Sequence, residues 1–464
     1  MPAPANSACS LDLSSADHEA IRYFRTTFAK IHHTKNPDYS LYAIIFNIAE
    51  RDAMVMRVVV ALGGQEVAFR RCNSTPNPTP THGHSVPPLQ HYSAALRMMA
   101  DALGRAYAET VPDLDLDVTF AALFLMLLYE KKYGEPGSAG VSNHLAGAAQ
   151  VIRHRFHSQP PRISTRDTHD ISNKVVLVRR CPSQQQRAQV LSLFSARLLV
   201  HLAIQDSAAA TFGMGGRLLE ALNETTHDHD SNLPYCDGSE SLNRFSYSLY
   251  RTMWADQYPQ TELLDDLENR GIFTLLTSTA QLRFMVAQLR TLDASSVPSR
   301  AAEIHAAIKF VSFRFAEILA VADELSVATD NSNRLVANIR DIVPHFYAVQ
   351  IELGRAKRDA GMDMDASWPP SGQFISAIMS LAAQSFKHQG NEAMIRIAWP
   401  LYVVALETDC EAQFDWIISR FRAMSIYGSN FARAYQHLAQ ISQSDIDETC
   451  QQSGTCNNTG LFVL

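Results

Sequence analysis

Residues 117–156 read DVTFAALFLMLLYEKKYGEPGSAGVSNHLAGAAQVIRHRF, and this stretch decides the fold class. Asp117 can cap a helix by accepting a hydrogen bond from its first turn. The ten residues from Phe120 to Tyr129 are all apolar or aromatic. A helix that is apolar on every side is buried on every side, and crossing a bilayer would need about 20 apolar residues. The stretch therefore predicts a helix in the centre of a protein core.

The same stretch predicts a second helix after a Gly/Pro turn. Lys131 and Lys132 suit the C-terminal end of the first helix, where the helix dipole favours positive charge. Gly134 stands where a left-handed residue would end that helix, and Pro136 prevents its continuation. The second helix carries one apolar stripe, made of Val141, Leu145, Ala148 and Ile152.

Helical periodicity continues through most of the chain, whereas strand alternation is nearly absent. Patterns in the C-terminal half predict helices at 241–256, 260–290, 299–328, 333–356, 371–388, 391–407, 411–425 and 428–440. The best strand candidate is Lys174–Val178 (KVVLV), which has no obvious partner. We therefore predict an all-α protein, a large helical bundle or array. Its parts would be a disordered N-terminus at 1–13, a helical domain at 14–441 and a flexible C-terminal tail at 442–464.

Composition and charge narrow the function classes. The chain has 464 residues, of which 46% are hydrophobic and 19% charged, as expected for a globular chain with a sizeable core. The net charge of −7 weighs against a phosphate-binding surface, because nucleic-acid-binding domains usually carry a basic face. The start MPAPANSACSLDLSS lacks the features of a signal peptide, and we expect no membrane span. The seven cysteines are scattered, which fits a reducing compartment.

No motif predicts a catalytic, cofactor-binding or metal-binding residue. His227–Asp230 offers metal-ligand types, but adjacent loop residues rarely point at one ion. The glycines of TFGMGG at 211–216 hint at a phosphate loop, but the Lys-Ser/Thr pair of that loop is missing, so a helix-terminating turn is the better interpretation. Cys450 and Cys456 are interpreted as free thiols in the tail.

Three histidines are interpreted as structural. His32 and His33 lie at a predicted helix end, where imidazole suits the dipole. His144 is expected to cap a helix or to hydrogen-bond between helices, since partly buried histidines normally find a partner.

Several sequence blocks, taken in order, carry a resemblance to a known family. They are Ala20–Phe24 (AIRYF), Gln90–Leu96 (QHYSAAL), Leu123–Glu130 followed by Ser142–Ala148 (SNHLAGA), Phe194–Gly216, and Trp399–Glu407. With them the chain resembles the second fungal-specific transcription factor domain family, the regulatory domain found downstream of a zinc-cluster DNA-binding module. The resemblance covers roughly residues 15–430.

The resemblance implies a helical regulatory domain without catalytic residues. Proteins of this class bind DNA through six cysteines that hold two zinc ions. This chain departs from that pattern, because Cys9 is followed by no cysteine until Cys72 and no CxxC occurs. Zinc binding and direct base reading therefore do not carry over, and we expect neither a metal nor another cofactor.

The function that the resemblance implies is transcription regulation through protein contacts. We expect a protein of the nucleus, or one that shuttles between nucleus and cytoplasm. Its partners would be other transcription factors or a second copy of itself, in a hetero- or homodimer. A small-molecule effector in a helix-lined pocket is a further expected partner, whereas direct DNA binding by this chain is not expected.

Two alternatives stay open. The chain could be an all-α enzyme that uses a pocket histidine such as His144 or His201, which would require convergent ionisable groups in one cleft. It could also be a helical scaffold without a role in transcription.

Overall fold

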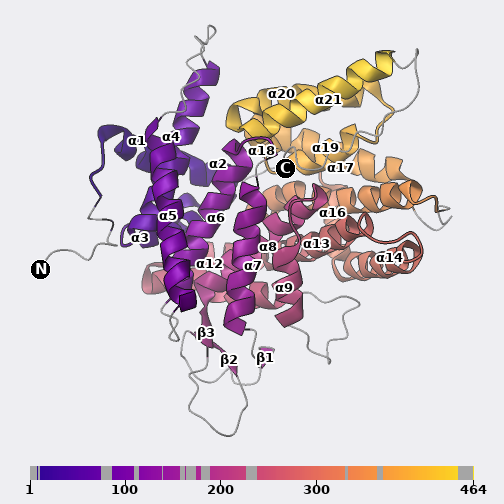
Figure 1. Ribbon diagram of the computed structural model, residues 1–464. Coiled ribbons are helices and arrows are strands. Elements are labelled where there is room, and N and C mark those ends of the chain that lie inside the picture. The colour runs from indigo at the N-terminus through magenta and orange to yellow at the C-terminus, as the bar shows by residue number, and fades with distance from the viewer. Residues whose placement is uncertain are drawn as a thin grey trace, which may run out of the picture.

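The computed structural model describes residues 8, 11–74, 86–108, 114–137, 139–156, 162–163, 174–178, 189–225, 238–329, 333–362, 369–447 and 463–464. Helices make up most of these residues, so the predicted all-α class is confirmed. The chain crosses the molecule from α1 on one side to α20 and α21 on the other (Figure 1). None of the helices in the described ranges combines the length and the hydrophobicity that spanning a bilayer requires.

The helices before residue 230 include α6, which contains the buried stretch Phe120–Tyr129, and its neighbours. They are α1 (Ser15–Tyr23), α2 (Ala29–His32), α3 (Leu41–Ala49), α4 (Ala53–Ser74), α5 (Val86–Ala108), α6 (Leu116–Tyr133), α7 (Gly140–Phe156), α8 (Leu193–Thr211) and α9 (Arg217–Thr225).

The helices after residue 230 build the other half of the array. They are α10 (Gly238–Phe245), α11 (Leu249–Trp254), α12 (Gln260–Glu268), α13 (Arg270–Leu289), α14 (Val297–Arg314), α15 (Ala316–Glu324), α16 (Arg334–Asp359), α17 (Ser371–Gln389), α18 (Asn391–Met394), α19 (Ala398–Ala405), α20 (Glu411–Met424) and α21 (Ser429–Asp447).

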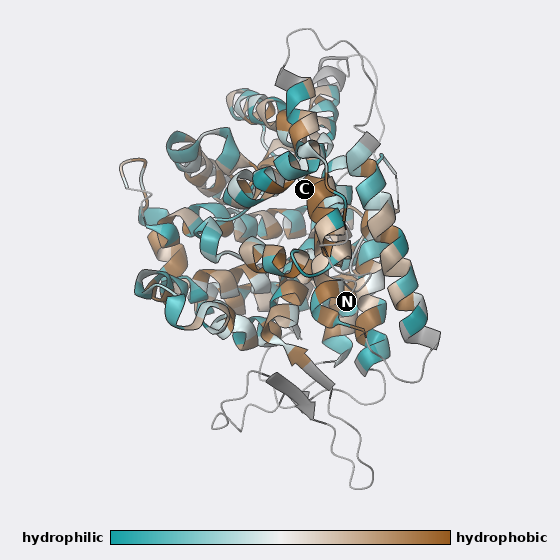
Figure 2. Ribbon diagram, turned by 90° about the vertical axis from the view of Figure 1, so that its left-hand side faces the viewer, coloured by the Kyte–Doolittle hydropathy of each residue, from teal (hydrophilic) through white to brown (hydrophobic). Residues whose placement is uncertain are grey.

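Helix packing links the two halves through a central series. Helix α4 packs against α1, α5 and α6, and α6 packs against α7 and α8. Helix α8 then packs on α13, α13 on α16, and α16 on α17 and α19. Figure 2 shows hydrophobic turns gathered towards the middle of the molecule and hydrophilic turns around its edge. The helices α6, α8, α13 and α16 therefore form the centre of the core.

Helix α6 confirms the predicted buried helix, with two corrections at its ends. All residues from Phe120 to Tyr129 are buried. The cap is Asp115 and not Asp117, because the Asp115 side chain accepts from the backbone N–H groups of Asp117 and Val118. The Asp117 carboxylate instead accepts from hydroxyls that begin α8. Gly134 has φ −59°, so it does not end the helix in the left-handed conformation that the sequence predicts.

A π-helical segment, Phe24–Phe28, connects α1 to α2. Its backbone bond runs from the N–H of Ala29 to the carbonyl of Phe24, one residue longer than an α-helical bond. Phe24 and Phe28 are fully buried and stack on each other with ring centroids 5.3 Å apart. Helix α2, which ends at His32, therefore begins directly after a segment that is anchored in the core.

Four predicted helices of the C-terminal half are each divided into two, the first of them the pattern at 241–256, which forms α10 and α11. The pattern at 260–290 forms α12 and α13, the pattern at 299–328 forms α14 and α15, and the pattern at 391–407 forms α18 and α19. At the break between α12 and α13, the Asn269 amide donates to the backbone carbonyl of Asp265 and accepts from Asn338 on α16. A long-range contact therefore holds this break.

The strand predicted at Lys174–Val178 is present as β2. It pairs antiparallel with β1 (Arg162–Ile163) and with β3 (Gln189–Ser192), which leads into α8. The order β1-β2-β3 is that of a small three-stranded sheet, which lies at the lower edge of the array in Figure 1. The partners that the sequence did not reveal are therefore two short neighbouring segments.

The predicted ends of the helical domain fall partly outside the described residues. Residues 1–7 and 9–10 are not described, whereas Leu11 and Leu13 pack against the core. Helix α21 continues to Asp447, past residue 442 where the flexible tail was predicted to begin. Residues 448–462 lie outside the described part, and Val463 and Leu464 are buried.

Candidate functional site

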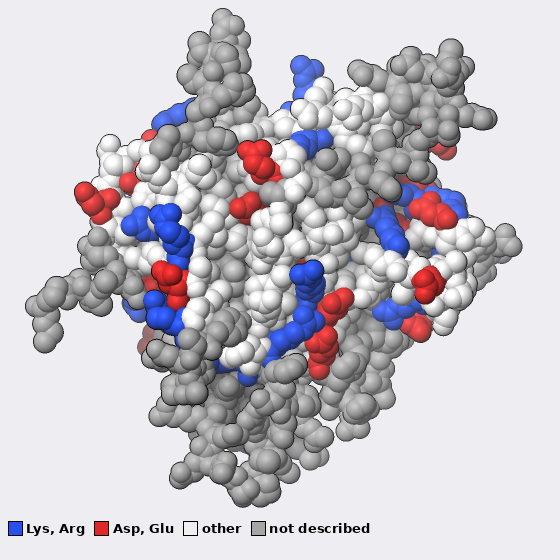
Figure 3. Space-filling model, viewed as in Figure 1, with Lys and Arg blue, Asp and Glu red and all other residues white. Residues whose placement is uncertain are grey.

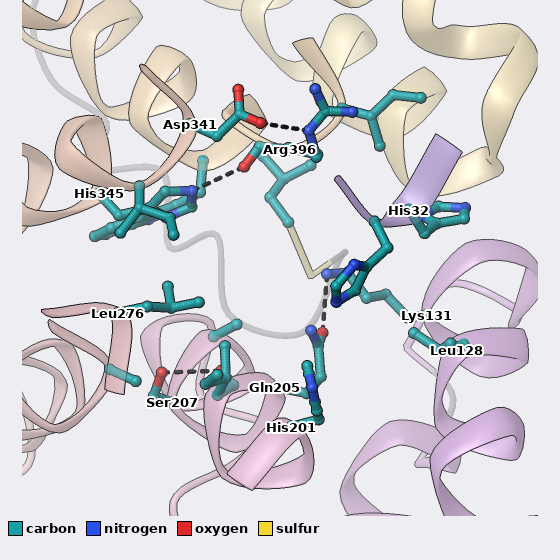
Figure 4. A pocket seen from close by; sticks show the side chains of 18 of the residues that line it. His32, Leu128, Lys131, His201, Gln205, Ser207, Leu276, Asp341, His345 and Arg396 are labelled. Carbon is teal, nitrogen blue, oxygen red and sulfur yellow. Dashed lines mark hydrogen bonds and ion pairs between the residues drawn. The ribbon is translucent and has the colours of Figure 1, made fainter. Parts of the chain in front are cut away.

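A cavity of about 280 Å³ lies at the centre of the helix array. Its walls come from α2, α3, α6, α8, α13, α16, α19 and α21, which meet there from distant parts of the chain. Figure 4 shows side chains from these helices converging on the cavity. The apolar part of the lining comprises Leu41, Tyr42, Phe124, Leu128, Ile204, Ala208, Phe273, Leu276, Ala280, Ile342, Ile395, Trp399, Phe431 and Leu464.

Lys131, near the end of α6, brings an amine to this lining without a carboxylate partner. Its Nζ donates to Oε1 of Gln205 on α8 at 3.0 Å, as the dashed line in Figure 4 marks. No acidic residue in the described part of the chain forms an ion pair with it. Burial, together with the charges of Arg283 and Lys132, lowers the pKa of Lys131 to about 7. The positive form of this amine is therefore poorly compensated.

Arg283 on α13 is a second cation of the lining without a carboxylate partner. Its Nε donates to the Thr211 hydroxyl at 2.7 Å, and its guanidinium carbon lies 3.6 Å from the ring centroid of Trp399. The side chain is only 7% exposed, and Nη2 is buried without a hydrogen-bond partner in the described structure. Burial lowers the pKa of Arg283 to about 9.

Thr279 lies one helical turn before Arg283 and also lines the cavity. Its side chain is 2% exposed, and its hydroxyl oxygen is buried without a partner in the described residues. Residues four apart on a helix face the same side. Thr279 and Arg283 therefore place two buried polar groups with unused hydrogen-bonding capacity side by side on one wall.

The other two cations of the lining are paired with carboxylates. The Lys132 amine contacts Glu66 of α4 at 2.7 Å, and Arg396 Nε contacts Asp341 of α16 at 2.6 Å. In each of these two pairs the formal charges of the cation and the carboxylate cancel. The net positive charge of the cavity therefore comes from Lys131 and Arg283.

The imidazoles of the cavity are neutral. Nε2 of His32 lies 3.1 Å from the Lys132 amine, which can only donate, so this nitrogen accepts and the ring proton sits on Nδ1. Nε2 of His345 donates to the Arg396 carbonyl at 2.8 Å, and burial lowers the pKa of His345 to about 4. Nδ1 of His33 accepts from the Lys35 N–H, which places the proton on Nε2.

These contacts correct the interpretation of His32 and His33 as dipole-stabilised cations at a helix end. Burial lowers the pKa of both rings well below the usual value, and nearby cations add to the effect. Both rings line the cavity, so their surroundings and not the helix terminus set their charge.

The two histidines of the enzyme alternative are in different places. His144 on α7 lies outside the cavity lining, and its Nε2 contacts the Tyr92 hydroxyl of α5 at 2.9 Å, as expected for a bond between helices. His201 lines the cavity, and burial, together with the charge of Arg197, lowers its pKa to about 3, so its imidazole is neutral and weakly basic near neutral pH. Among the described residues, no group of three or more His, Cys, Asp or Glu is arranged to hold a metal ion.

The glycine-rich loop after α8 is a helix-terminating turn, as predicted. Gly213 and Gly216 have φ of 75° and 105°, which glycine adopts without strain. The buried Asp206 carboxylate accepts from the backbone N–H groups of Gly216, Leu218 and Leu219 at 2.8–3.0 Å. The start of α9 is thus already occupied by an internal anion, where a phosphate loop would bind its ligand.

Other predicted positions fall outside the site or outside the described residues. His227–Asp230, Cys450 and Cys456 are not described. Cys72 and Cys410 are exposed. A larger cavity of about 590 Å³ lies on another side of Trp399, where Arg290 and Arg355 share the carboxylate of Glu352, and none of its described lining residues has a buried side-chain polar atom without a partner. It lacks the unpaired groups of the central cavity.

Comparisons with models of protein families, with curated proteins and with solved structures give no match for this chain.

Sequence reasoning missed Lys131 and Arg283 as functional candidates. Lys131 was interpreted only as a partner of the helix dipole, because a lysine after an apolar helix usually reaches solvent. The signal for Arg283 is a cation inside the apolar run from Leu282 to Val286. A charged residue in a helix that is otherwise buried requires a partner or a ligand.

Proposed function

We propose that this protein is a transcription regulator of the fungal type, which acts through its helical domain by protein contacts and carries no zinc-cluster module within this chain. The observation that supports this proposal is the ordered set of sequence blocks that resemble the family. These blocks lie on α1, α5, α6, α7, α8 and α19, all of which contribute to one core.

Exposed apolar side chains support a role in protein contacts. Phe313 on α14 is 84% exposed, and Leu264 and Leu267 on α12 are more than half exposed. Exposing large apolar side chains to water is unfavourable, and contact with another protein would remove this cost. We propose that α12 and α14 contribute to contacts with a partner transcription factor or with a second copy of this chain.

The central cavity supports a role for a small effector. It is lined by helices from both halves of the chain, so a ligand inside it would contact both halves at once. A ligand that binds the folded array and not the unfolded chain stabilises the array by mass action. Effector binding can thus be linked to the surface that partners contact.

A tethering experiment tests the transcriptional role. The whole chain is fused to a heterologous DNA-binding module of known site, and transcription of a reporter with that site is measured in fungal cells. We expect a change of at least about tenfold, up or down, relative to the module alone, because recruitment needs only the protein contacts. A Phe313→Asp fusion is expected to weaken the response.

The matched control is Lys30→Met, which changes an exposed residue of α2 and should leave the reporter unchanged. An equal reporter signal from the fusion and from the module alone, with the fusion present in the nucleus at normal abundance, would contradict the proposal. Turnover of a substrate by the purified chain would favour the enzyme alternative.

A further inference from the structure

We infer that the central cavity binds an apolar monocarboxylate, whose carboxylate is held by Lys131, Arg283 and Thr279. This inference rests on the proposed function, since it names the chemical class of the effector. It is carried by three observations, namely unpaired cations, unpaired polar atoms on the same wall and a mostly apolar lining.

The charge of the ligand follows from the cations that lack partners. Lys132 and Arg396 each form an ion pair with a carboxylate, whereas no described carboxylate forms an ion pair with Lys131 or Arg283, and Glu352 acts on Arg283 only from outside ion-pair distance. Burying a charge is costly unless the charge is paired. A ligand anion would supply the missing pair for both residues, and the charge of Arg283 already acts on the Lys131 amine.

The position of the ligand anion follows from the unused donors. Nη2 of Arg283 and the hydroxyl of Thr279 are buried without partners, one turn apart on α13. The Lys131 amine, facing from α6, uses one of its three hydrogens on Gln205. A carboxylate has two oxygens and about four acceptor sites, which matches a set of donors on two helices that line the same cavity.

The single charge and the apolar body of the ligand follow from the rest of the lining. Aromatic and aliphatic side chains from α3, α6, α8, α13, α16 and α19 form most of the remaining wall. The nearby imidazoles are neutral, and the bonds of His32, His33 and His345 are made within the protein. A second anionic group would therefore find no further unpaired cation among the described lining residues.

The size of the ligand follows from the volume. A cavity of about 150 Å³ holds a benzene molecule, which has six non-hydrogen atoms. The central cavity of about 280 Å³ is nearly twice as large. It would accommodate an aliphatic or aromatic acid of about a dozen non-hydrogen atoms.

Calorimetric titration of the purified full chain tests the inference. The probes are decanoate and 2-naphthoate, and the uncharged counterparts are 1-decanol and 2-naphthylmethanol. We expect at least one acid to bind, and its counterpart to bind at least about tenfold more weakly, because hydrogen bonds to a charged group contribute more than neutral ones. Acetate, which lacks the apolar body, should not compete at equal concentration.

Variants separate the charge from the shape of the site. Lys131→Met should weaken binding of the acid by at least about tenfold and leave the alcohol unchanged. Ala280→Leu fills the apolar part of the cavity and should abolish binding of both. Thr279→Val should weaken the acid alone, and Lys30→Met, at an exposed position, should change neither. Circular dichroism verifies that each variant is folded.

The inference is overturned if neither acid binds at a concentration of about 1 mM, because the binding free energy would then be weaker than roughly −4 kcal/mol. It is also overturned if acid and alcohol bind equally, or if folded Lys131→Met binds the acid as the unmodified chain does. If the acid binds but the tethered reporter does not respond, the ligand site is supported and the transcriptional role is refuted. A reporter response without binding of either acid would refute only the ligand.

Discussion

The buried Lys131 amine destabilises the folded protein, and the size of this effect depends on pH. The folded protein lowers the pKa of its amine from 10.5 to about 7, chiefly through burial. In the unfolded chain the amine is solvated and titrates near its usual pKa of about 10.4. Between these pKa values the unfolded chain binds more protons than the folded protein, so the free energy of unfolding rises with pH in this window.

We therefore predict that Lys131→Met stabilises the ligand-free protein. At pH 7 the free energy of unfolding should increase by on the order of 1–3 kcal/mol, because an unpaired buried cation is replaced by an apolar side chain of similar length. The variant should also lose the part of the increase between pH 7 and 9 that this amine contributes. Urea unfolding at both pH values measures the effect.

The comparison for this prediction is Lys30→Met, which changes an exposed lysine and should shift stability by less than about 0.5 kcal/mol. A loss of stability in Lys131→Met would show that the amine makes a favourable contact in the folded protein. The predicted net positive charge of the cavity would then be wrong.

The cavity residues show the limit of sequence reasoning at this scale. A stripe or a buried run can be read from periodicity, and Phe120–Tyr129 was found in this way. Whether Lys131 reaches solvent or the core depends on what α8 and α13 place opposite it, and those helices are far away in the sequence. The neutral state of His32 and His33 was missed for the same reason.

At the scale of elements, the approach of α1 to α4 depends on a single missing side chain. A Cβ atom at Gly63 would lie 2.3 Å from the backbone carbonyl oxygen of Ala20. Backbone cannot move out of the way as the end of a flexible side chain can. The two helices are therefore in contact only because residue 63 is glycine.

We predict that Gly63→Ala lowers the free energy of unfolding by about 1–3 kcal/mol, because the added methyl group forces α1 away from α4. Gly104→Ala on α5 is the matched control, since a Cβ there would meet nothing within 4 Å. That control should be neutral or stabilising by up to about 1 kcal/mol, as alanine favours helix over glycine. Equal effects of the two substitutions in denaturant titrations would refute the close contact.

The breaks between elements show why helix boundaries were harder to predict than helices. In the patterns at 260–290 and 391–407, apolar residues recur at helical spacing on both sides of the break, so periodicity gives one helix in each case. The first break depends on Asn269, which bonds to Asn338 about seventy residues away, and no local pattern marks such a contact. The strand Lys174–Val178 was found from its β-branched residues, but its pairing was not.

At the scale of the whole molecule, the surface charge is mixed. On the face shown in Figure 3, acidic and basic side chains alternate around wide uncharged areas, and no continuous basic area appears. Several surface cations are paired locally, as in the pairs of Arg314 with Glu240 and of Arg153 with Glu224. The net charge of −7 adds a general repulsion of phosphate backbones.

We predict that the isolated chain does not bind DNA with sequence specificity. Affinity for duplex DNA, measured by fluorescence anisotropy, should be weak at 50 mM salt and should fall further at 200 mM, because only counterion release would drive it. A control duplex of random sequence should bind equally well. Tight binding to one sequence at about 150 mM salt would contradict this expectation and would locate a DNA-reading surface within this chain.

The π-helical segment Phe24–Phe28 has a consequence for how this site can change over time. An α-helix turns by about 100° per residue, so one extra residue wound into the segment rotates everything after it by that amount. Deleting one residue from 24–28 would therefore rotate α2, and with it His32 and His33, relative to the part of the lining that α6, α8 and α13 provide. Ligand preference in a lineage of such proteins could therefore shift through a three-nucleotide loss rather than through substitutions in the binding wall.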